Sequence, residues 1–287
     1  MGRVQLSPPP IVLATDFGLA DAYVGMMRGV IFSINPHASV IDLTHGIAPQ
    51  DVCHGAVALS DAHPYFPERS IFVAVVDPGV GTDRFAVLLE TPDHRFVAPD
   101  NGLLTLVCRR YDSQFGAGDV SGPATLPDGC RAWRLTNPGY WRHPVSATFH
   151  GRDVFAPVAA HLSAGVIPDM LGDPTPVITA LSLPPPRPAG NSVRGQIVFA
   201  DAFGNLVSDI TAEILSNMGV PAREPEAVVS IAGHEIIGLS RTFHDPPGDG
   251  LRALVGSHGR LEVALVDGSA SAALGVASGT EIVLRVG

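Results

Sequence analysis

Five short segments in the first part of the sequence carry side chains that can move protons or hold charge, and four of them also contain glycine. They are Thr15–Gly18, Asp42–His45, Asp77–Gly81, Pro99–Gly102 and His150–Asp153. Aspartate and histidine can orient a water molecule and take its proton, and arginine can stabilise the negative charge that develops. Each segment alone is a weak signal, because sequences such as Asp-Pro-Gly and Asp-Asn-Gly are also good turn sequences. Five of them in one domain exceed what turns need, so they predict a ligand site.

The elements that must position these segments alternate between strand-like and helix-like patterns. The predicted strands are 11–14, 39–43, 70–76, 85–89 and 95–98. The predicted helices are 21–34, capped by Asp21, 52–59, 103–110 and 153–162. This alternation predicts an α/β domain with a mostly parallel sheet and helices on both faces. In such sheets ligands bind at the carboxyl ends of the strands, where the five segments lie.

The pattern changes at two places along the chain. Residues 111–144 are rich in Gly, Pro, Asp and Ser and read as a long excursion. Its aromatic residues Trp133, Tyr140 and Trp141 belong either to a lid or interface element or to a packed surface loop. Residues 183–192 are proline-rich and predict a semi-rigid linker between a catalytic domain, 10–182, and a second domain, 193–287.

The second domain is predicted to be a small all-β, barrel-like unit. Its apolar runs are short and separated by glycine-containing turns, as in antiparallel barrels. The predicted strands are 193–200, 227–231, 235–237, 252–255, 261–265 and 281–286.

Composition excludes several classes of protein. The chain has 287 residues, is 46% hydrophobic and carries a net charge of −10. It has no basic stripe for nucleic acid, since the pair Arg109 and Arg110 reads as a solvated helix end. Three cysteines without CxxC spacing read as ordinary core residues of a cytoplasmic protein. The N-terminus does not read as a signal peptide, and no apolar run reaches the roughly 18 residues that a membrane span needs.

The longer motifs around these segments resemble one known family. VVDPGVGTDR at 75–84, APDNGLL at 98–104 and TFHGRDVFAPVAAHL at 148–162 are similar to the S-adenosyl-L-methionine hydroxide adenosyltransferases, relatives of fluorinase and chlorinase. Four further segments match the same family: TDFGLADAYVGMMRGV at 15–30, IDLTHGI at 41–47, DAFGNLVSDI at 201–210 and GSHGRLEVALVDGSA at 256–270. The resemblance implies an α/β domain followed by a β-barrel domain, and hydrolysis of S-adenosyl-L-methionine to adenosine and L-methionine.

The resemblance assigns a catalytic trio to Asp77, Arg84 and His150. The substrate's sulfonium already makes ribose C5′ an electrophile with a neutral leaving group, so only a nucleophile is missing. A carboxylate and an imidazole can activate water for in-line attack, and a guanidinium can stabilise the hydroxide. The expected chemistry needs no metal and no cofactor.

The resemblance also implies the residues that bind the substrate. Asp16 is expected to bind the ribose 2′- and 3′-hydroxyls and Asp201 the α-ammonium group. The other expected contacts are Phe203 and Asn205 with adenine, Phe243 as a stacking partner and Ser257 with the methionine carboxylate. His258 stands where halogenating relatives have an arginine, so this carboxylate contact stays open. The family implies a homotrimer with the substrate between subunits, although a site within one chain would look the same.

Three other functions compete with this hypothesis. A metal-dependent hydrolase could draw ligands from Asp16, Asp42, His45, His54, His150 and Asp153, although no HxH or HxxxH spacing occurs. A non-catalytic adenosine or S-adenosyl-L-methionine binder would have no use for the trio. A halogenase is disfavoured because an ionised Asp77 repels halide, and the resemblance implies a neutral residue there in halogenating members.

Overall fold

The computed structural model describes residues 8–221, 223–245 and 250–287. The chain divides into two compact units, the first ending at Pro184 and the second beginning at Pro185. The segment predicted as a linker is not wholly irregular. It contains strand β10 (Arg187–Ala189), which pairs antiparallel with β11 (Ser192–Ala200).

The N-terminal unit is built on a seven-stranded mixed sheet in the described residues. Its order is β2 (Val40–Thr44), β1 (Ile11–Thr15), β3 (Ile71–Val75), β5 (Arg95–Pro99), β4 (Ala86–Glu90), β7 (Arg131–Arg134) and β8 (Asp173–Thr175). The first four strands run parallel, as the sequence predicts. The last three add antiparallel. The α/β class is confirmed.

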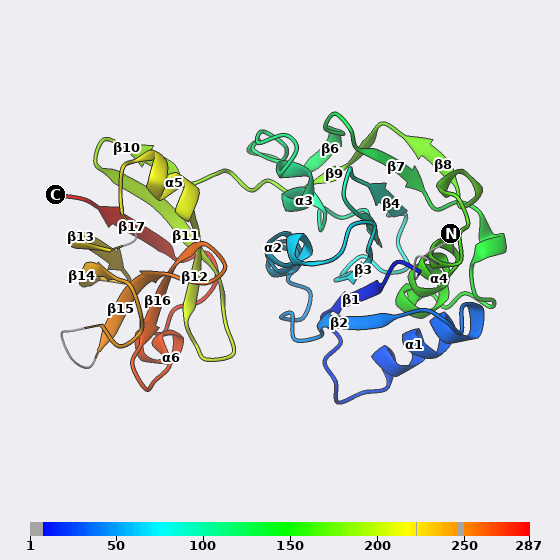
Figure 1. Cartoon of the computed structure of the whole chain (residues 1–287), viewed down its shortest axis with the longest axis horizontal. Coiled ribbons are helices and arrows are strands. Elements are labelled where there is room, and N and C mark those ends of the chain that lie inside the picture. The colour runs from blue at the N-terminus through cyan, green and yellow to red at the C-terminus, as the bar shows by residue number, and fades with distance from the viewer. Residues whose placement is uncertain (1–7, 222, 246–249) are drawn as a thin grey trace, which may run out of the picture. The chain divides into compact units, whose positions relative to one another are not determined.

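Helices cover both faces of this sheet (Figure 1). On one face Leu13 and Val73 pack with α1 (Tyr23–Ile34) and α4 (Ala156–Ser163). On the other face Val12 and Phe72 pack with α2 (Val52–Ala62) and α3 (Thr105–Arg109). Successive residues of a strand point to opposite faces, so continuous apolar strands are buried on both sides.

The excursion predicted at 111–144 is not a separate element. It supplies β7 to the main sheet, and β6 (Gly122–Thr125) pairs with β9 (Val177–Ala180). Trp133 is 4% exposed within the core, which excludes it from a lid. Tyr140 and Trp141 pack partly buried against the same core. Strand β7 is not predicted from the sequence because it is only four residues long and has an arginine at each end.

The helices differ from the sequence prediction in two places. A π-helical turn, η3 (Gly151–Phe155), precedes α4 where one continuous helix was expected. At α1 the N-cap is Ala22 without a side-chain bond, so the predicted cap by Asp21 is wrong. The remaining turns are the 3₁₀ segments η1 (His63–Tyr65), η2 (Pro138–Tyr140) and η4 (Pro168–Met170).

Arg109 is not the solvated helix end that the sequence suggested. Its guanidinium donates to the carbonyl oxygens of Phe115, at 3.0 Å, and Leu183, at 2.7 Å. It therefore fixes the chain after α3 and the segment that leaves the N-terminal unit.

The C-terminal unit is a closed β-barrel, as predicted. Its seven strands in the described residues run in the order β11, β12 (Leu206–Thr211), β16 (Arg260–Leu265), β15 (Leu251–Val255), β14 (His234–Ser240), β13 (Glu224–Ile231) and β17 (Glu281–Arg285). β17 pairs back onto β11 and closes the ring. Two short helices, α5 (Ala212–Asn217) and α6 (Ala270–Leu274), accompany the strands. No described helix is long and apolar enough to cross a membrane.

Candidate active site

The loops after β1 and β3 meet the start of η3 around a hollow of about 400 Å³, here called the front hollow. Its lining residues are Asp16, Phe17, Tyr23, Pro49, Gln50, Val75, Asp77, Pro78, Val80, Thr148, Phe149, His150 and Gly151. The site therefore forms at the carboxyl ends of adjacent parallel strands, where ligands bind in such sheets. Three of the predicted site residues, Asp16, Asp77 and His150, lie together here.

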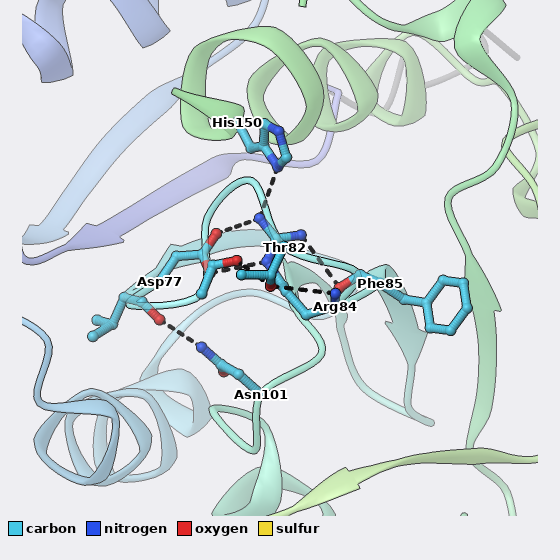
Figure 2. Close-up of polar contacts among 8 residues, drawn as sticks. Asp77, Thr82, Arg84, Phe85, Asn101 and His150 are labelled. Atoms are coloured by element: carbon cyan, nitrogen blue, oxygen red, sulfur yellow. Dashed lines mark hydrogen bonds and ion pairs between the residues drawn. The ribbon is translucent and has the colours of Figure 1, made fainter. Parts of the chain in front are cut away.

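Asp77, Arg84 and His150 form one connected chain of polar contacts (Figure 2). Nε of Arg84 donates to Oδ1 of Asp77 at 2.9 Å, and Nη2 donates to Oδ2. The same Nη2 donates to Nδ1 of His150 at 2.8 Å. The side chains of Arg84 and Asp77 are only 10% and 5% exposed. The predicted trio is thus assembled in the structure and largely shielded from solvent.

The Arg84 contact fixes the proton positions on His150. A guanidinium only donates, so Nδ1 must accept and a neutral ring carries its proton on Nε2. Burial, and next the positive charge of Arg84, lower the pKa of His150 below its ordinary 6.5. His150 is therefore a neutral ring at pH 7 with Nε2–H available as a donor. No partner for Nε2 is present among the described residues.

The turn after β3 holds Asp77 beside His150. Amide groups of Val80 and Thr82 donate to the carbonyls of Asp77 and Gly79, at 3.2 and 3.1 Å. Gly81 has φ +80°, and a Cβ there would lie 2.4 Å from the carbonyl oxygen of Ala147. Only glycine lets the turn dock this closely on the segment that leads to His150.

A second loop supports the same turn. Nδ2 of Asn101 donates to the carbonyl oxygen of Val76 at 2.8 Å, immediately before Asp77 (Figure 2). Oδ1 of Asp100 accepts from the amide of Thr179 at 2.6 Å. Asp100 and Asn101 thus shape the loop.

Asp16 presents its carboxylate at the edge of the front hollow. Its Oδ2 accepts from the amide of Gln50 at 2.8 Å. The apolar wall beside it is an aromatic cluster of Phe17, Tyr23 and Phe149, with ring centroids 5.1–5.8 Å apart. Such rings suit the face of a planar or apolar ligand group.

Sequence reasoning missed this wall. Phe17 and Phe149 stand inside the motifs TDFG and TFHG, next to residues that were singled out, so a signal for them existed. Tyr23 at the start of α1 is 46% exposed and lines the hollow. Gln50 carried no signal, because only the folded chain brings its amide to Asp16.

A second hollow of about 300 Å³, here called the rear hollow, lies on the other side of the Asp77–Arg84 pair. It is lined by Arg84, Phe85, Ala86, Leu135, Thr136, Trp141, Val145, His150 and Val154. His150 lines both hollows, Asp77 only the front one and Arg84 only the rear one. The guanidinium centre of Arg84 also lies 5.4 Å from the ring centroid of Phe155, a cation–π contact.

Three of the residues that the metal hypothesis names are engaged in other contacts. Asp42 pairs with Arg28, and its Oδ1 lies 3.1 Å from Nε2 of His45, whose Nδ1 bonds to Thr15 at 2.8 Å. Asp153 is fully buried, and Arg152 binds both of its oxygens at 2.7 Å. Within the described part of the chain no three His, Cys, Asp or Glu side chains are grouped to hold a metal ion.

The other predicted substrate residues belong to the barrel unit. Oδ1 of Asp201 accepts from the amides of Phe203 and Asn205, and its Oδ2 accepts from Nδ2 of Asn205, all at 2.9 Å. A carboxylate oxygen has two acceptor positions, so Oδ2 keeps one. Phe203 is 79% and Phe243 43% exposed. Ser257 is also exposed.

His258 follows Ser257 and pairs within the barrel. Its Nδ1 lies 3.3 Å from Oε1 of Glu262, whose side chain is 4% exposed. Burial raises the pKa of Glu262, and the nearby His258 opposes that rise. His258 is therefore tied to a buried acid.

Comparison with known proteins places the chain in one family over almost its whole length. The SAM hydroxide adenosyltransferase N-terminal domain matches residues 11–172, and the corresponding C-terminal domain matches residues 195–283. The chain is 38% identical over 273 residues to an (R)-S-adenosyl-L-methionine hydrolase of Thermus thermophilus, covering 95% of this chain and 98% of the relative. It is 37% identical over 286 residues to the hydrolase of the same name from Salinispora arenicola, covering 98% and 99%.

More distant and structural relatives agree. A fluorinase of Nocardia brasiliensis is 25% identical and covers 74% of this chain and 74% of the relative. A crystal structure of an uncharacterized conserved protein from Thermotoga maritima is 34% identical, covers 96% and 99% of the two chains, and superposes with a TM-score of 0.84. The chain belongs to the SAM hydroxide adenosyltransferase family.

Proposed function

We propose that this chain hydrolyses S-adenosyl-L-methionine to adenosine and L-methionine, by in-line attack of an activated water on ribose C5′. The observation that carries the proposal is the bonded chain of Asp77, Arg84 and His150, in which Asp77 and His150 line a hollow that also presents Asp16. The names of the hydrolases at 36–38% identity support the same activity.

The geometry divides the work among the three residues. Asp77 and His150 face the front hollow, and Arg84 stands behind them. Water in front donates one hydrogen to a free acceptor position of Asp77 and accepts from Nε2–H of His150. As the oxygen attacks C5′, its proton passes to Asp77, the C5′–S bond breaks and methionine leaves as a neutral thioether. His150 and the Arg84 charge behind it stabilise the hydroxide character.

This division refines the role expected of His150. An imidazole whose Nδ1 already accepts from Arg84, and whose Nε2 carries a proton, cannot take the proton from water. Asp77 is then the base and His150 the donor that orients the water. No metal ion is required for any of these steps.

The substrate-binding assignments fit the same picture and remain predictions. Oδ1 of Asp16 is the atom proposed to accept from the ribose hydroxyls, while Oδ2 accepts from the amide of Gln50. In the barrel unit Asp201 keeps one acceptor position for an ammonium group, and Asn205 keeps its side-chain oxygen for adenine. Phe203, Phe243 and Ser257 present exposed side chains. A homotrimer with the site between subunits and a cytoplasmic location also remain predictions.

A labelling experiment tests the reaction. The purified protein is incubated with S-adenosyl-L-methionine in ¹⁸O-water with a chelator, and the products are separated and weighed by mass spectrometry. We expect adenosine with ¹⁸O at the 5′ position and methionine in equal amount. Saturable retention of substrate without adenosine would support the binding-only alternative. Activity lost with chelator and restored by a divalent ion would support the metal hydrolase.

A halogenase is tested in the same assay by adding chloride or fluoride. A halide ion needs hydrogen-bond donors, whereas the Asp77 carboxylate offers only acceptors at the front hollow. We therefore expect no 5′-halogenated adenosine at any halide concentration. Its appearance would support the halogenase alternative.

A further inference from the structure

The turn that presents Asp16 to the front hollow is held at both ends by one residue, His45. Nδ1 of its ring lies 2.8 Å from Oγ1 of Thr15, the last residue of β1. Its carbonyl oxygen accepts from the amide of Gly18, also at 2.8 Å. His45 directly follows β2, the edge strand that pairs with β1 (Figure 1). The neighbouring strand therefore closes the turn on either side of Asp16.

Side-chain contacts continue from His45 outward to α1. Nε2 of His45 lies 3.1 Å from Oδ1 of Asp42, although without the alignment of a full hydrogen bond. Oδ2 of Asp42 accepts from Nη2 of Arg28. Burial alone would raise the pKa of Asp42, but the contacts with Arg28 and His45 lower it below its ordinary value. Asp42 is therefore ionised at neutral pH, and its charge anchors the outer end of the contacts.

This anchor sets the direction of the hydrogen bonds. A ring nitrogen 3.1 Å from a carboxylate oxygen carries a proton, because two lone pairs would repel each other. When the ring is neutral, Nδ1 of His45 is then the acceptor, and the Thr15 hydroxyl donates to it. Oγ1 of Thr15 in turn accepts from the amide of Phe17 at 3.2 Å. The contacts thus run in one direction, from the amide that follows Asp16 to the carboxylate of Asp42.

The inner members of this chain cannot reach a ligand themselves. Thr15 is 0% and His45 5% exposed. Asp16 can reach one, but among the described residues its carboxylate has a single hydrogen bond, from the amide of Gln50 to Oδ2. The direction of its other oxygen therefore depends on the backbone that carries it, which is the backbone that Thr15 and His45 hold.

We propose that Thr15, His45 and Asp42 form a positioning chain that holds Asp16 in place for the ribose hydroxyls. A hydrogen bond weakens steeply when its angle or length departs from the optimum, so a displaced carboxylate would bind the hydroxyls poorly. The chain gives Asp42 and His45 a role that differs from the metal ligands considered above. This inference rests on the proposed function, in which Asp16 binds the ribose, and adds the residues that make it selective.

Thr15→Val tests the chain, because valine has nearly the shape of threonine but lacks the hydroxyl. Calorimetry should show adenosine binding weakened about tenfold, as expected when a hydrogen bond to a charged group is lost. Binding of 2′,3′-dideoxyadenosine, which lacks both hydroxyls, should change less than about twofold. Thr15→Ser restores the hydroxyl and should restore the adenosine affinity. An equal loss for both nucleosides would mean a general loosening of the site and would overturn the inference.

The aromatic wall beside Asp16 should not confuse this readout. The ring of Phe17 packs against the rings of Tyr23 and Phe149, each with centroids 5.8 Å apart, and these contacts do not involve Thr15. Contacts between the wall and a nucleoside should therefore survive in Thr15→Val. This is why the dideoxy analogue separates the position of Asp16 from the rest of the hollow.

A double-mutant cycle shows whether the effect passes through Asp16. In the Asp16→Asn background, adding Thr15→Val should weaken adenosine binding by less than about twofold, whereas independent sites would give the full loss again. The matched control is Thr91→Val. Thr91 is 5% exposed, and its hydroxyl donates to the carbonyl of His94 and accepts from its amide at the opposite end of the sheet. This control should keep its adenosine affinity.

The outer end of the chain is tested at Asp42. Asp42→Ala should weaken adenosine binding in the same direction, by about threefold, the usual size of one lost hydrogen bond. Asp42→Asn keeps an oxygen that can face Nε2 of His45, and it should stay closer to wild type. Wild-type affinity in Asp42→Ala would remove Asp42 from the chain.

Steady-state kinetics separate this inference from the proposed hydrolysis. Thr15→Val should raise KM about tenfold and leave kcat within about twofold, because the trio is untouched. A fall in kcat with unchanged adenosine affinity would contradict the inference. A wild-type protein that prefers adenosine to the dideoxy analogue but releases no adenosine from S-adenosyl-L-methionine would refute the hydrolysis and still support the chain. A wild-type protein that binds both nucleosides alike would refute the chain, whatever its activity.

Discussion

The α-carbon of Gly81 faces the carbonyl oxygen of Ala147 so closely that an added Cβ would lie 2.4 Å from it. This approach joins the turn that carries Asp77 to the segment that carries His150. Two motifs about seventy positions apart in the sequence thereby become one site. The catalytic arrangement depends on a residue that has no side chain to contribute.

Gly81→Ala should therefore disturb both the fold and the reaction. A Cβ in the left-handed region and against a backbone oxygen should cost about 1–3 kcal/mol of stability. Displacement of Asp77 by about 1 Å should lower kcat by up to about 10²-fold. The control is Gly79→Ala, whose Cβ would meet its neighbours at 3.4–3.9 Å without a positive φ. Thermal unfolding and adenosine release measure the two effects; equal behaviour of both variants would contradict the argument.

Asp77→Asn should retain substrate binding and lose turnover. The amide cannot take a proton from water, so we expect kcat to fall about 10²–10⁴-fold, the usual contribution of a general base. Binding measured by calorimetry should change little, because Asp77 acts on the nucleophile. Asp83→Asn removes a carboxylate from an exposed position of the same turn and should behave as wild type. Full activity of Asp77→Asn would refute the proposed mechanism.

Asp16→Asn should have the opposite kinetic signature. Asparagine keeps one acceptor for the amide of Gln50 but loses the charged oxygen proposed for the ribose hydroxyls. Losing a hydrogen bond to a charged group should raise KM roughly 10–100-fold while kcat changes less. Asp21→Asn, at an exposed site nearby, is the control. A loss confined to kcat would contradict the binding role and would indicate that Asp16 takes part in the chemical step.

Activity should fall on the acid side with a midpoint below pH 6.5. Burial and the charge of Arg84 lower the pKa of His150, so the ring stays neutral through pH 7. Protonation would remove the acceptor at Nδ1 and set two cations side by side. A pH profile of kcat/KM should be level above pH 6.5 and decline below it. An acid limb centred above 6.5 would contradict the lowered pKa of His150.

A second histidine should make stability depend on pH. Burial, and next the charge of Arg110, lower the pKa of His63 to about 4 from 6.5. The unfolded chain then binds a proton first, so this stability is complete above pH 6.5 and is lost as pH falls toward 4. The full difference is about 3 kcal/mol. Denaturant unfolding should show that the stability of His63→Phe lacks this pH dependence. The control His37→Phe, at an exposed site, should keep it.

The sequence predicts the parts of the site that are local to a strand and its following turn. Asp16 follows β1 and Asp77 follows β3, so the parallel sheet brings these two residues to one edge, and His150 joins them at the start of η3. Arg84 was assigned through its motif, and the structure adds that it contacts both partners. The α/β domain and the barrel were predictable because their apolar periods are strong.

Features that depend on long-range docking could not be predicted. The contact of Gly81 with Ala147 joins segments that have no shared pattern. Strand β7 is too short and too charged to be predicted from its sequence pattern, yet it places Trp133 in the core. In each case the partner is chosen by tertiary packing.

The closure of the barrel has a consequence for how the protein is made. β11 begins the ring at Ser192, and β17, which completes it, begins only at Glu281. On a ribosome that delivers residues in order, the sheet of the N-terminal unit can form while the barrel still has two open edges. Those edges stay exposed until Glu281–Arg285 emerges, and nascent chains stalled before that point should be the species that chaperones bind.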